Sequence, residues 1–314
     1  MISVDPKEYR LNKQQIRDSF NKAAAAYDQT ALLQQEVCKR LLERLEYIKA
    51  APRVILDLGA GTGQGSFGLA AQYPSAHIIS LDLAEKMLLQ MRQNIRYQGI
   101  VKKLLRWLGQ FNPGHENSNH SFVCADAEQL PIQDASVDLI FSNLTIQWCG
   151  DLTGLFGEFR RILKPGGLLL FTTLGPDTLK ELRASWSMVS DKVHVNQFAD
   201  MHDIGDALYN VQAENPVMDS ERLIVNYQSV KDILLDLKAV GAHNQNSGRE
   251  KALTGKTRLK SMYQAYEQFR TEAGYPLTYE VLYGHAWNPA TPLQHRTDNQ
   301  TSISLCQLKS SLSS

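Results

Sequence analysis

Cysteine is scarce in this chain, and long apolar runs are missing. The four cysteines, at positions 38, 124, 149 and 306, are scattered over 314 residues and show no metal-ligand spacing. No apolar run approaches the roughly 20 residues that span a bilayer, and residues 1–10 contain no signal-peptide core. These absences exclude a disulfide-stapled fold and a cysteine metal site, so we expect a soluble, cytoplasmic protein without a membrane partner.

Net charge is also missing. The 33 Lys and Arg residues balance the 33 Asp and Glu residues, so no global field attracts nucleic acid. An apolar content of 43% over this length is enough for one large core or two small ones. The composition predicts a globular enzyme that does not bind nucleic acid, and it leaves the oligomeric state open.

The most informative motif is a glycine-rich turn after a predicted strand. Residues 54–58 are apolar and largely branched, residues 59–65 are rich in glycine, and an apolar segment of helical character follows. Glycines at such a turn allow a ligand to approach the backbone closely. The turn lacks the full dinucleotide spacing, and Asp57 precedes it, where a carboxylate would repel a pyrophosphate. The motif alone is weakly specific, but it favours a cationic ligand such as S-adenosylmethionine.

Acidic residues recur at the ends of later predicted strands. Asp82 ends a strand at 77–82, about 20 residues beyond the turn, where an open α/β sheet places the acid that binds ribose hydroxyls. Asp126 lies at the end of the strand segment 122–127, where it is suited to accept the adenine amino group. The acids are therefore expected along one edge of the sheet.

Two more strands complete the core pattern. They are predicted at 137–143 and 168–173, the second after a helix stop and turn at 163–167. In this order the motifs resemble those of the class I S-adenosylmethionine-dependent methyltransferases. The resemblance implies a Rossmann-like α/β fold with a seven-stranded, mostly parallel sheet. It also implies a cofactor-binding set: Asp57, Gly59, Gly61, Gly63, Asp82, Asp126, Ala127 and Asn143.

Hydrophobic periodicity divides the chain into five regions. We predict an N-terminal helical cap at 1–50, an S-adenosylmethionine-binding core at 51–175, a helical lid at 176–215 inserted after the fifth strand, a C-terminal completion of the sheet at 216–287 and a disordered tail at 288–314. The last two strands are expected at 221–228 and 279–287, with helices at about 229–240 and 257–272 between them. Residues 99–119 are expected to form an amphipathic insertion with a mobile loop.

Segments outside the core resemble a family of the biotin pathway that methylates the free carboxyl of malonyl-acyl carrier protein. The similarity is carried by residues 19–28, 145–149 and 171–176, and it extends over about 18–287. Shorter matches lie at 194–198, 236–242, 253–255 and 276–280. The resemblance implies methyl transfer to a malonyl thioester carried by acyl carrier protein or coenzyme A, and it implies that Tyr27 gates the cofactor.

The acceptor chemistry predicts few further residues. A malonyl carboxylate is already ionised at pH 7, so its attack on the sulfonium methyl needs alignment rather than a general base. A cation is expected to bind the carboxylate without blocking the attacking oxygen, and the candidates are His194, Lys238, Arg183 and Arg249. For each the alternative is an ordinary surface charge. Trp148 is a candidate wall of the transfer chamber, and an apolar wall is expected to exclude a free dianion.

Two basic clusters are candidates for docking an acidic carrier protein. They comprise Arg249, Lys251, Lys256, Arg258 and Lys260 in one segment and Lys102, Lys103 and Arg106 in the other. The alternative for both is a solvated helix face with compensating acids.

Two other functions stay open. Residues 177–183 and 235–237 are also similar to the complex I assembly factor type, which acts on a protein arginine. The signature around Tyr27 and the absence of a mitochondrial-type presequence pattern favour the carboxyl methyltransferase. A scaffold that has lost its cofactor would show broken acids or glycines in the motifs, whereas these are present.

Overall fold

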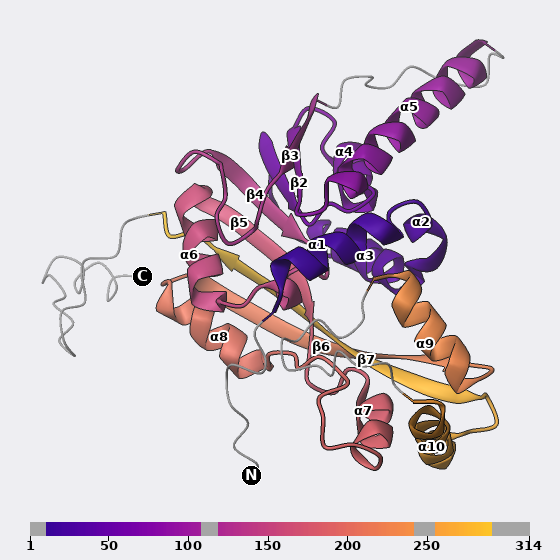
Figure 1. Cartoon of the computed structure of the whole chain (residues 1–314). Coiled ribbons are helices and arrows are strands. Elements are labelled where there is room, and N and C mark those ends of the chain that lie inside the picture. The colour runs from indigo at the N-terminus through magenta and orange to yellow at the C-terminus, as the bar shows by residue number, and fades with distance from the viewer. Residues whose placement is uncertain (1–10, 108–118, 242–254, 291–314) are drawn as a thin grey trace, which may run out of the picture.

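A seven-stranded sheet forms the centre of the molecule (Figure 1). The computed structural model describes residues 11–107, 119–241 and 255–290. The strands are β1 (Val54–Leu58), β2 (His77–Asp82), β3 (Asn119–Cys124), β4 (Val137–Ser142), β5 (Leu163–Leu174), β6 (Glu214–Tyr227) and β7 (Tyr275–Trp287), in the order β3-β2-β1-β4-β5-β7-β6. Pairs among β1 to β5 are parallel, and β7 runs antiparallel to both β5 and β6. The predicted α/β, seven-stranded and mostly parallel fold is confirmed.

Helices cover the sheet and its carboxyl edge. They are α1 (Lys13–Ala23), α2 (Tyr27–Thr30), α3 (Leu32–Leu45), α4 (Gln64–Gln72), α5 (Glu85–Trp107), α6 (Leu152–Ile162), α7 (Lys180–Ser187), α8 (Met201–Asn210), α9 (Val230–Ala239) and α10 (Lys256–Tyr266), with short 3₁₀ helices η2 (Ile146–Trp148) and η3 (Glu267–Phe269). Polar side chains cap the N-termini of several of these helices. Asn12 accepts a hydrogen bond from the backbone of Gln15 at α1, and Asp151 accepts one from Gly154 at α6.

The alternation of side chains along the strands builds a core on each face of the sheet. On β1, Leu56 and Leu58 pack into the cluster beneath α6 and α8, whereas Ile55 packs into the cluster beneath α3 and α4. Because both faces are covered, the central strands β1 and β4 are apolar at most positions. This core fixes the carboxyl ends of β1, β2 and β4, which carry the predicted site residues.

The last two strands begin earlier than the sequence predicts. β6 starts at Glu214 rather than at 221, and β7 starts at Tyr275 rather than at 279. They pair along their whole length, from Glu214 opposite Trp287 to Tyr227 opposite Tyr275. β6 is an edge strand with many exposed polar residues, so its amino-terminal half lacks the apolar pattern of a strand.

The two helices of the predicted lid have different neighbours. Helix α7 packs against α10 and β7, whereas α8 packs against α6 and β6 and contributes to a core cluster. The proposed division into cap, core, lid and C-terminal completion remains a prediction.

Some predicted features lie partly or wholly outside the described residues. The segment 99–119 begins within α5, and residues 108–118 lie outside the described residues. So do Arg249, Lys251 and the tail from 291 onward. None of the helices in the described ranges is both long and apolar enough to cross a membrane.

Candidate active site

The turn between β1 and α4 brings open backbone to the carboxyl edge of the sheet. Gly59, Gly61 and Gly63 have φ angles of +72°, +55° and +104°, which disfavour any residue with a Cβ. A Cβ on Gly59 would lie 1.9 Å from Oγ1 of Thr145, whereas a Cβ on Gly61 would first meet the ring of Tyr27 at 3.9 Å. Gly59 therefore permits close packing against the loop after β4, and Gly61 faces the Tyr27 ring.

Asp82, at the end of β2, is held by this turn. Its Oδ2 accepts a hydrogen bond of 2.9 Å from the Gly61 backbone, and its Oδ1 accepts one of 2.7 Å from Ala84. Burial nevertheless raises the pKa of its carboxyl from 3.8 to about 6. The protein therefore holds this group in place without compensating its charge fully.

Asp57 lies behind the same turn and is buried. Its Oδ2 accepts a hydrogen bond of 2.5 Å from the Ser66 hydroxyl on α4. Burial raises its pKa from 3.8 to about 7, and the charge of Asp82 adds to the rise. Two neighbouring acids with raised pKa values make the turn favourable for a ligand with positive charge.

A cradle of two adjoining lobes surrounds these acids. One lobe of about 90 Å³ is lined by Asp82, Asp126 and Ala127, and the other, of about 50 Å³, is lined by Asp57. Gly59, Gly61, Asn143 and Tyr27 line both lobes. The structure thus brings together every predicted cofactor residue except Gly63, which lines neither lobe. At Gly63 a Cβ would meet Met91 and Phe67, so this glycine serves the packing of the turn.

Asp126 has a partner that the sequence did not indicate. Nζ of Lys13, on α1, lies 2.9 Å from Oδ1 of Asp126 and 3.0 Å from Oε2 of Glu128. Lys13 also lines the lobe that contains Asp82. The N-terminal helix is thereby tied to the loop after β3.

Asn143 connects the cradle to its surroundings. Its Nδ2 donates to the backbone oxygen of Gln34 on α3 at 3.0 Å, and its Oδ1 accepts from Oγ1 of Thr172 on β5 at 2.9 Å. Both ends of this amide are therefore used within the protein, so Asn143 fixes α3 over the sheet edge.

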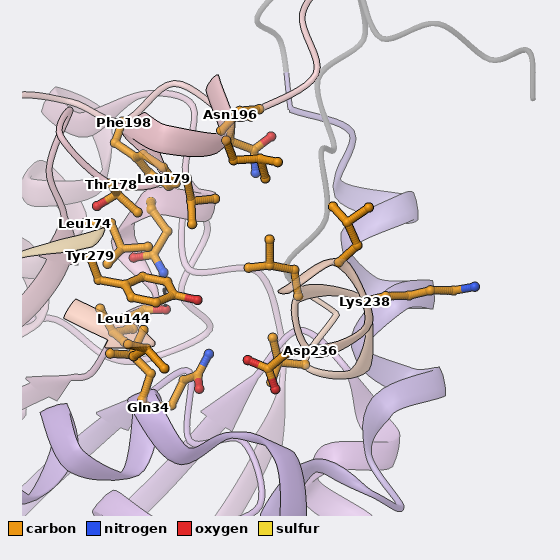
Figure 2. A pocket seen from close by; sticks show the side chains of 18 of the residues that line it. Gln34, Leu144, Leu174, Thr178, Leu179, Asn196, Phe198, Asp236, Lys238 and Tyr279 are labelled. Carbon is orange, nitrogen blue, oxygen red and sulfur yellow. Dashed lines mark hydrogen bonds between the residues drawn. The ribbon is translucent and has the colours of Figure 1, made fainter. Parts of the chain in front are cut away.

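A larger cavity of about 560 Å³ adjoins the cradle (Figure 2). Its walls come from α1, α2, α3, η2, the end of β5, α7, the segment 193–198, β6, α9 and β7. The apolar lining includes Leu33, Leu174, Leu179, Leu182, Trp186 and Phe198. Such a chamber suits an uncharged acyl chain with polar groups at defined points.

Aromatic rings separate the two compartments. Tyr27, Phe20 and Trp148 line both the cavity and the cradle. The Phe20 ring packs edge-on against Tyr27 and Trp148, with centroid distances of 6.4 and 5.6 Å. Burial and the nearby Asp82 raise the pKa of the Tyr27 hydroxyl, so this group stays protonated at neutral pH. A ligand group passing between the compartments meets these rings.

The predicted carboxylate binders are placed differently from one another. His194 lines the cavity and stacks on Trp186 with 4.0 Å between ring centroids. Lys238 lines the rim, but its amine points away from the cavity in Figure 2. Arg183 is not among the lining residues and donates to the backbone oxygens of Pro176 and Thr178 at 2.9 and 3.0 Å. It ties down the loop after β5.

Sequence reasoning missed a polar group of residues in the cavity. The Tyr227 hydroxyl donates to Oδ2 of Asp236 at 2.6 Å and is hydrogen-bonded to the Tyr279 hydroxyl. The side-chain oxygen of Gln34 is buried and has no hydrogen-bond partner among the described residues, and Gln34 lines both the cavity and the cradle. These residues come from α3, β6, α9 and β7, so no local spacing links them. The available signals were that Asp236 begins the family-like segment 236–242 and that Tyr279 lies within the family-like segment 276–280.

Comparisons with known proteins agree with this geometry. A model described as a methyltransferase domain matches residues 56–171. The chain is 46% identical over 290 residues to the malonyl-[acyl-carrier protein] O-methyltransferase of Nitrosospira multiformis, covering 92% of this chain and 93% of that protein. It is 47% identical over 283 residues to the protein of that name from Gallionella capsiferriformans, covering 90% and 93%.

The chain belongs to the malonyl-[acyl-carrier protein] O-methyltransferase family. The predicted family is thereby confirmed. Among solved structures, the YcgJ protein of Bacillus subtilis has the same fold, with a TM-score of 0.53, 15% identity and coverage of 80% of this chain and 99% of that one.

Proposed function

We propose that this protein transfers a methyl group from S-adenosylmethionine to the free carboxylate of a malonyl thioester on acyl carrier protein. The product is the methyl ester that primes pimeloyl synthesis for biotin. One observation carries the proposal: an acid-lined cradle with open backbone adjoins an apolar acyl-sized cavity, and Tyr27 lines both.

The cradle residues fit the cofactor in shape and in charge. Asp82 would hold the ribose hydroxyls, Asp126 and Ala127 would border the adenine, and the Gly59 and Gly61 backbone with Asp57 would hold the amino-acid end; these residues line the two lobes. When bound, S-adenosylmethionine supplies an electrophilic methyl group on a sulfonium. Burial raises the pKa of Asp57, with the charge of Asp82 adding to the rise, and a cationic ligand beside it would favour the ionised form of that acid.

The acceptor side aligns its substrate and excludes water. The malonyl carboxylate is ionised at neutral pH, so no residue has to remove a proton. Tyr27, Phe20 and Trp148 surround the passage between the compartments and keep water from the attacking oxygen. Gln34 and His194 provide polar contacts on the cavity wall for the carboxylate, whereas Arg183 shapes that wall through the loop after β5. The Lys238 amine reaches the substrate only if its side chain turns inward.

The carrier protein docks locally on this account, because the chain has no net charge. Lys256, Arg258 and Lys260 lie on α10, which packs against α7 beside the cavity, and they are the described part of the predicted basic cluster. Coenzyme A presents the same pantetheine arm and is the alternative carrier.

A mass-spectrometric assay tests the proposal. The purified protein is incubated with S-adenosylmethionine and with malonyl-, succinyl- or acetyl-acyl carrier protein. We expect one added methyl group on the malonyl form and none on the acetyl form, which has no free carboxyl. If the cofactor binds and no carrier is modified, the carboxyl-acceptor function fails and the arginine-modifying alternative becomes the leading hypothesis.

A further inference from the structure

A carboxylate faces the cavity that is to receive an anionic acyl group. Asp236 projects from α9 toward the cavity, opposite Tyr279 and Gln34, whereas its neighbour Lys238 points away (Figure 2). Oδ2 of Asp236 accepts the Tyr227 hydroxyl at 2.6 Å. Since the hydroxyl of Tyr227 is in turn hydrogen-bonded to that of Tyr279, one end of the cavity carries a fixed acceptor group.

This group belongs to the cavity and not to the cradle. Tyr27, Phe20, Leu144, Trp148 and Gln34 line both the cavity and a lobe of the cradle, but Asp236, Tyr227 and Tyr279 line the cavity alone. An acyl chain with its carboxylate at the cradle therefore has its other end available to Asp236.

Electrostatics decides which end of the substrate suits Asp236. Two carboxylates close together in the cavity repel each other, so the malonyl carboxylate is disfavoured there. An amide N–H is favoured, because a hydrogen bond to a charged acceptor is stronger than one between neutral groups. The pantetheine arm carries such an N–H a short ethylene spacer beyond the thioester sulfur.

We propose that Asp236, held by Tyr227, is a specificity-determining residue that accepts a hydrogen bond from the first amide of the pantetheine arm and thereby points the malonyl carboxylate toward the cradle. This inference rests on the proposed function and deepens it. It also assigns the rejection of free malonate to charge. A free dianion lacks the amide and brings a second negative charge into the cavity that Asp236 lines, so exclusion does not depend on an apolar wall alone.

The test compares two small thioesters that differ in the amide. Malonyl-N-acetylcysteamine retains the first amide of the arm, and malonyl S-pentyl thioester replaces it with hydrocarbon. For the wild type we expect kcat/KM to be about tenfold or more higher for the amide-bearing thioester, as for one hydrogen bond to a charged group. In Asp236→Asn this ratio should fall toward unity, with the loss mainly in KM. Asp206→Asn removes an exposed acid on α8, and the ratio should be unchanged.

The outcomes separate this inference from the proposed function. A ratio that is the same in Asp236→Asn and the wild type overturns the role of Asp236, because a merely structural residue affects both thioesters equally. If the wild type binds the cofactor but methylates neither these thioesters nor malonyl-acyl carrier protein, the proposed function and this inference both fail. Cofactor affinity equal to that of the wild type identifies a folded variant, and Asp236→Ser replaces the Asn variant if the latter does not fold.

Discussion

The cradle and the cavity recognise their ligands by different physical means. The cradle is small, is lined by glycine backbone and acids, and keeps Asp57 and Asp82 at raised pKa values. The cavity is several times larger and is lined mainly by apolar side chains, with Tyr227 and Asp236 at one end. On the proposed function, charge selects the cofactor, whereas shape and a few directed hydrogen bonds select the acceptor.

The difference has a consequence for catalysis. An ionised acceptor needs no base, so the protein gains rate by bringing two differently bound groups together at one opening. The rings of Phe20, Tyr27 and Trp148 form that opening. Changes within one compartment should therefore affect one ligand, and only changes at the rings should affect both.

The largest effect, on the stability of the fold, is expected from a side chain added in the glycine turn of the cradle. Gly59→Ala places a methyl group 1.9 Å from Oγ1 of Thr145 and forces a Cβ into positive φ. We expect a loss of about 3 kcal/mol or more in the free energy of unfolding, or failure to fold. Gly157→Ala on α6 is the matched control, because among the described residues nothing beyond its chain neighbours and the backbone of its own helix lies within 4 Å of its Cβ position. It should be neutral or stabilising by about 0.5–1 kcal/mol in urea unfolding. Equal stability of the two variants would contradict the packing of the turn.

Removing one charge from the cradle should weaken cofactor binding and leave acceptor binding unchanged. Asp82→Asn keeps the shape but loses the acceptor that holds the Gly61 amide at 2.9 Å and the charge that favours a cation. We expect about 2 kcal/mol of lost cofactor affinity, or about thirtyfold in Kd by calorimetric titration. The KM for the malonyl thioester at saturating cofactor should stay within a factor of about two, since this residue lies outside the cavity. A large rise in that KM with unchanged cofactor affinity would reverse the assignment of compartments.

In the absence of cofactor, the buried acid Asp57 of the cradle should make the free energy of unfolding depend on pH. The pKa of Asp57 is about 7 in the folded protein, above its usual value of 3.8, so the folded state binds this proton more tightly than the unfolded state. Its contribution therefore stabilises the protein as pH falls through 7, by up to about 1.4 kcal/mol per pH unit until the unfolded pKa is reached. Urea unfolding between pH 8 and pH 5 measures this. The free energy of unfolding of the wild type minus that of Asp57→Asn should rise as pH falls. A value of this difference that does not change with pH would contradict the burial of Asp57.

The smallest effect is expected from a hydroxyl at the opening. Tyr27→Phe retains the ring that faces Gly61, and its protonated hydroxyl has no proton to transfer in this reaction. We expect kcat/KM and cofactor Kd within about threefold of the wild type for Tyr27→Phe. For Tyr27→Ala, kcat/KM should fall and the cofactor Kd should rise, each by about tenfold or more. If Phe and Ala are equally impaired, the hydroxyl rather than the ring is the functional group.

The cradle was more predictable from sequence than the cavity, for a physical reason. Asp57, Gly59 and Gly61 lie on one strand and turn, and parallel strands bring Asp82 and Asp126 to the same edge, so local pattern and topology suffice. The cavity is assembled from segments far apart in the chain. Nothing in the sequence indicates that Asp236 of α9 faces Tyr279 of β7 or that Lys238 turns outward.

Residue type alone does not distinguish a cation that faces the cavity from one that holds the fold together. Arg183 was a reasonable cation for a carboxylate, but its guanidinium holds backbone oxygens of the loop after β5. Lys13 was overlooked because its importance arises only when α1 folds back on Asp126. Such pairings depend on tertiary packing, which periodicity does not report.

The most direct test of the two-compartment account is a crystal structure with S-adenosylhomocysteine and an amide analogue of malonyl-pantetheine. We predict the adenosine between Asp82 and Asp126, the malonyl carboxyl at the rings of Tyr27 and Trp148, and the arm passing Asp236. A malonyl carboxyl beside Asp236, or an acyl chain outside the 560 Å³ cavity, would contradict the account.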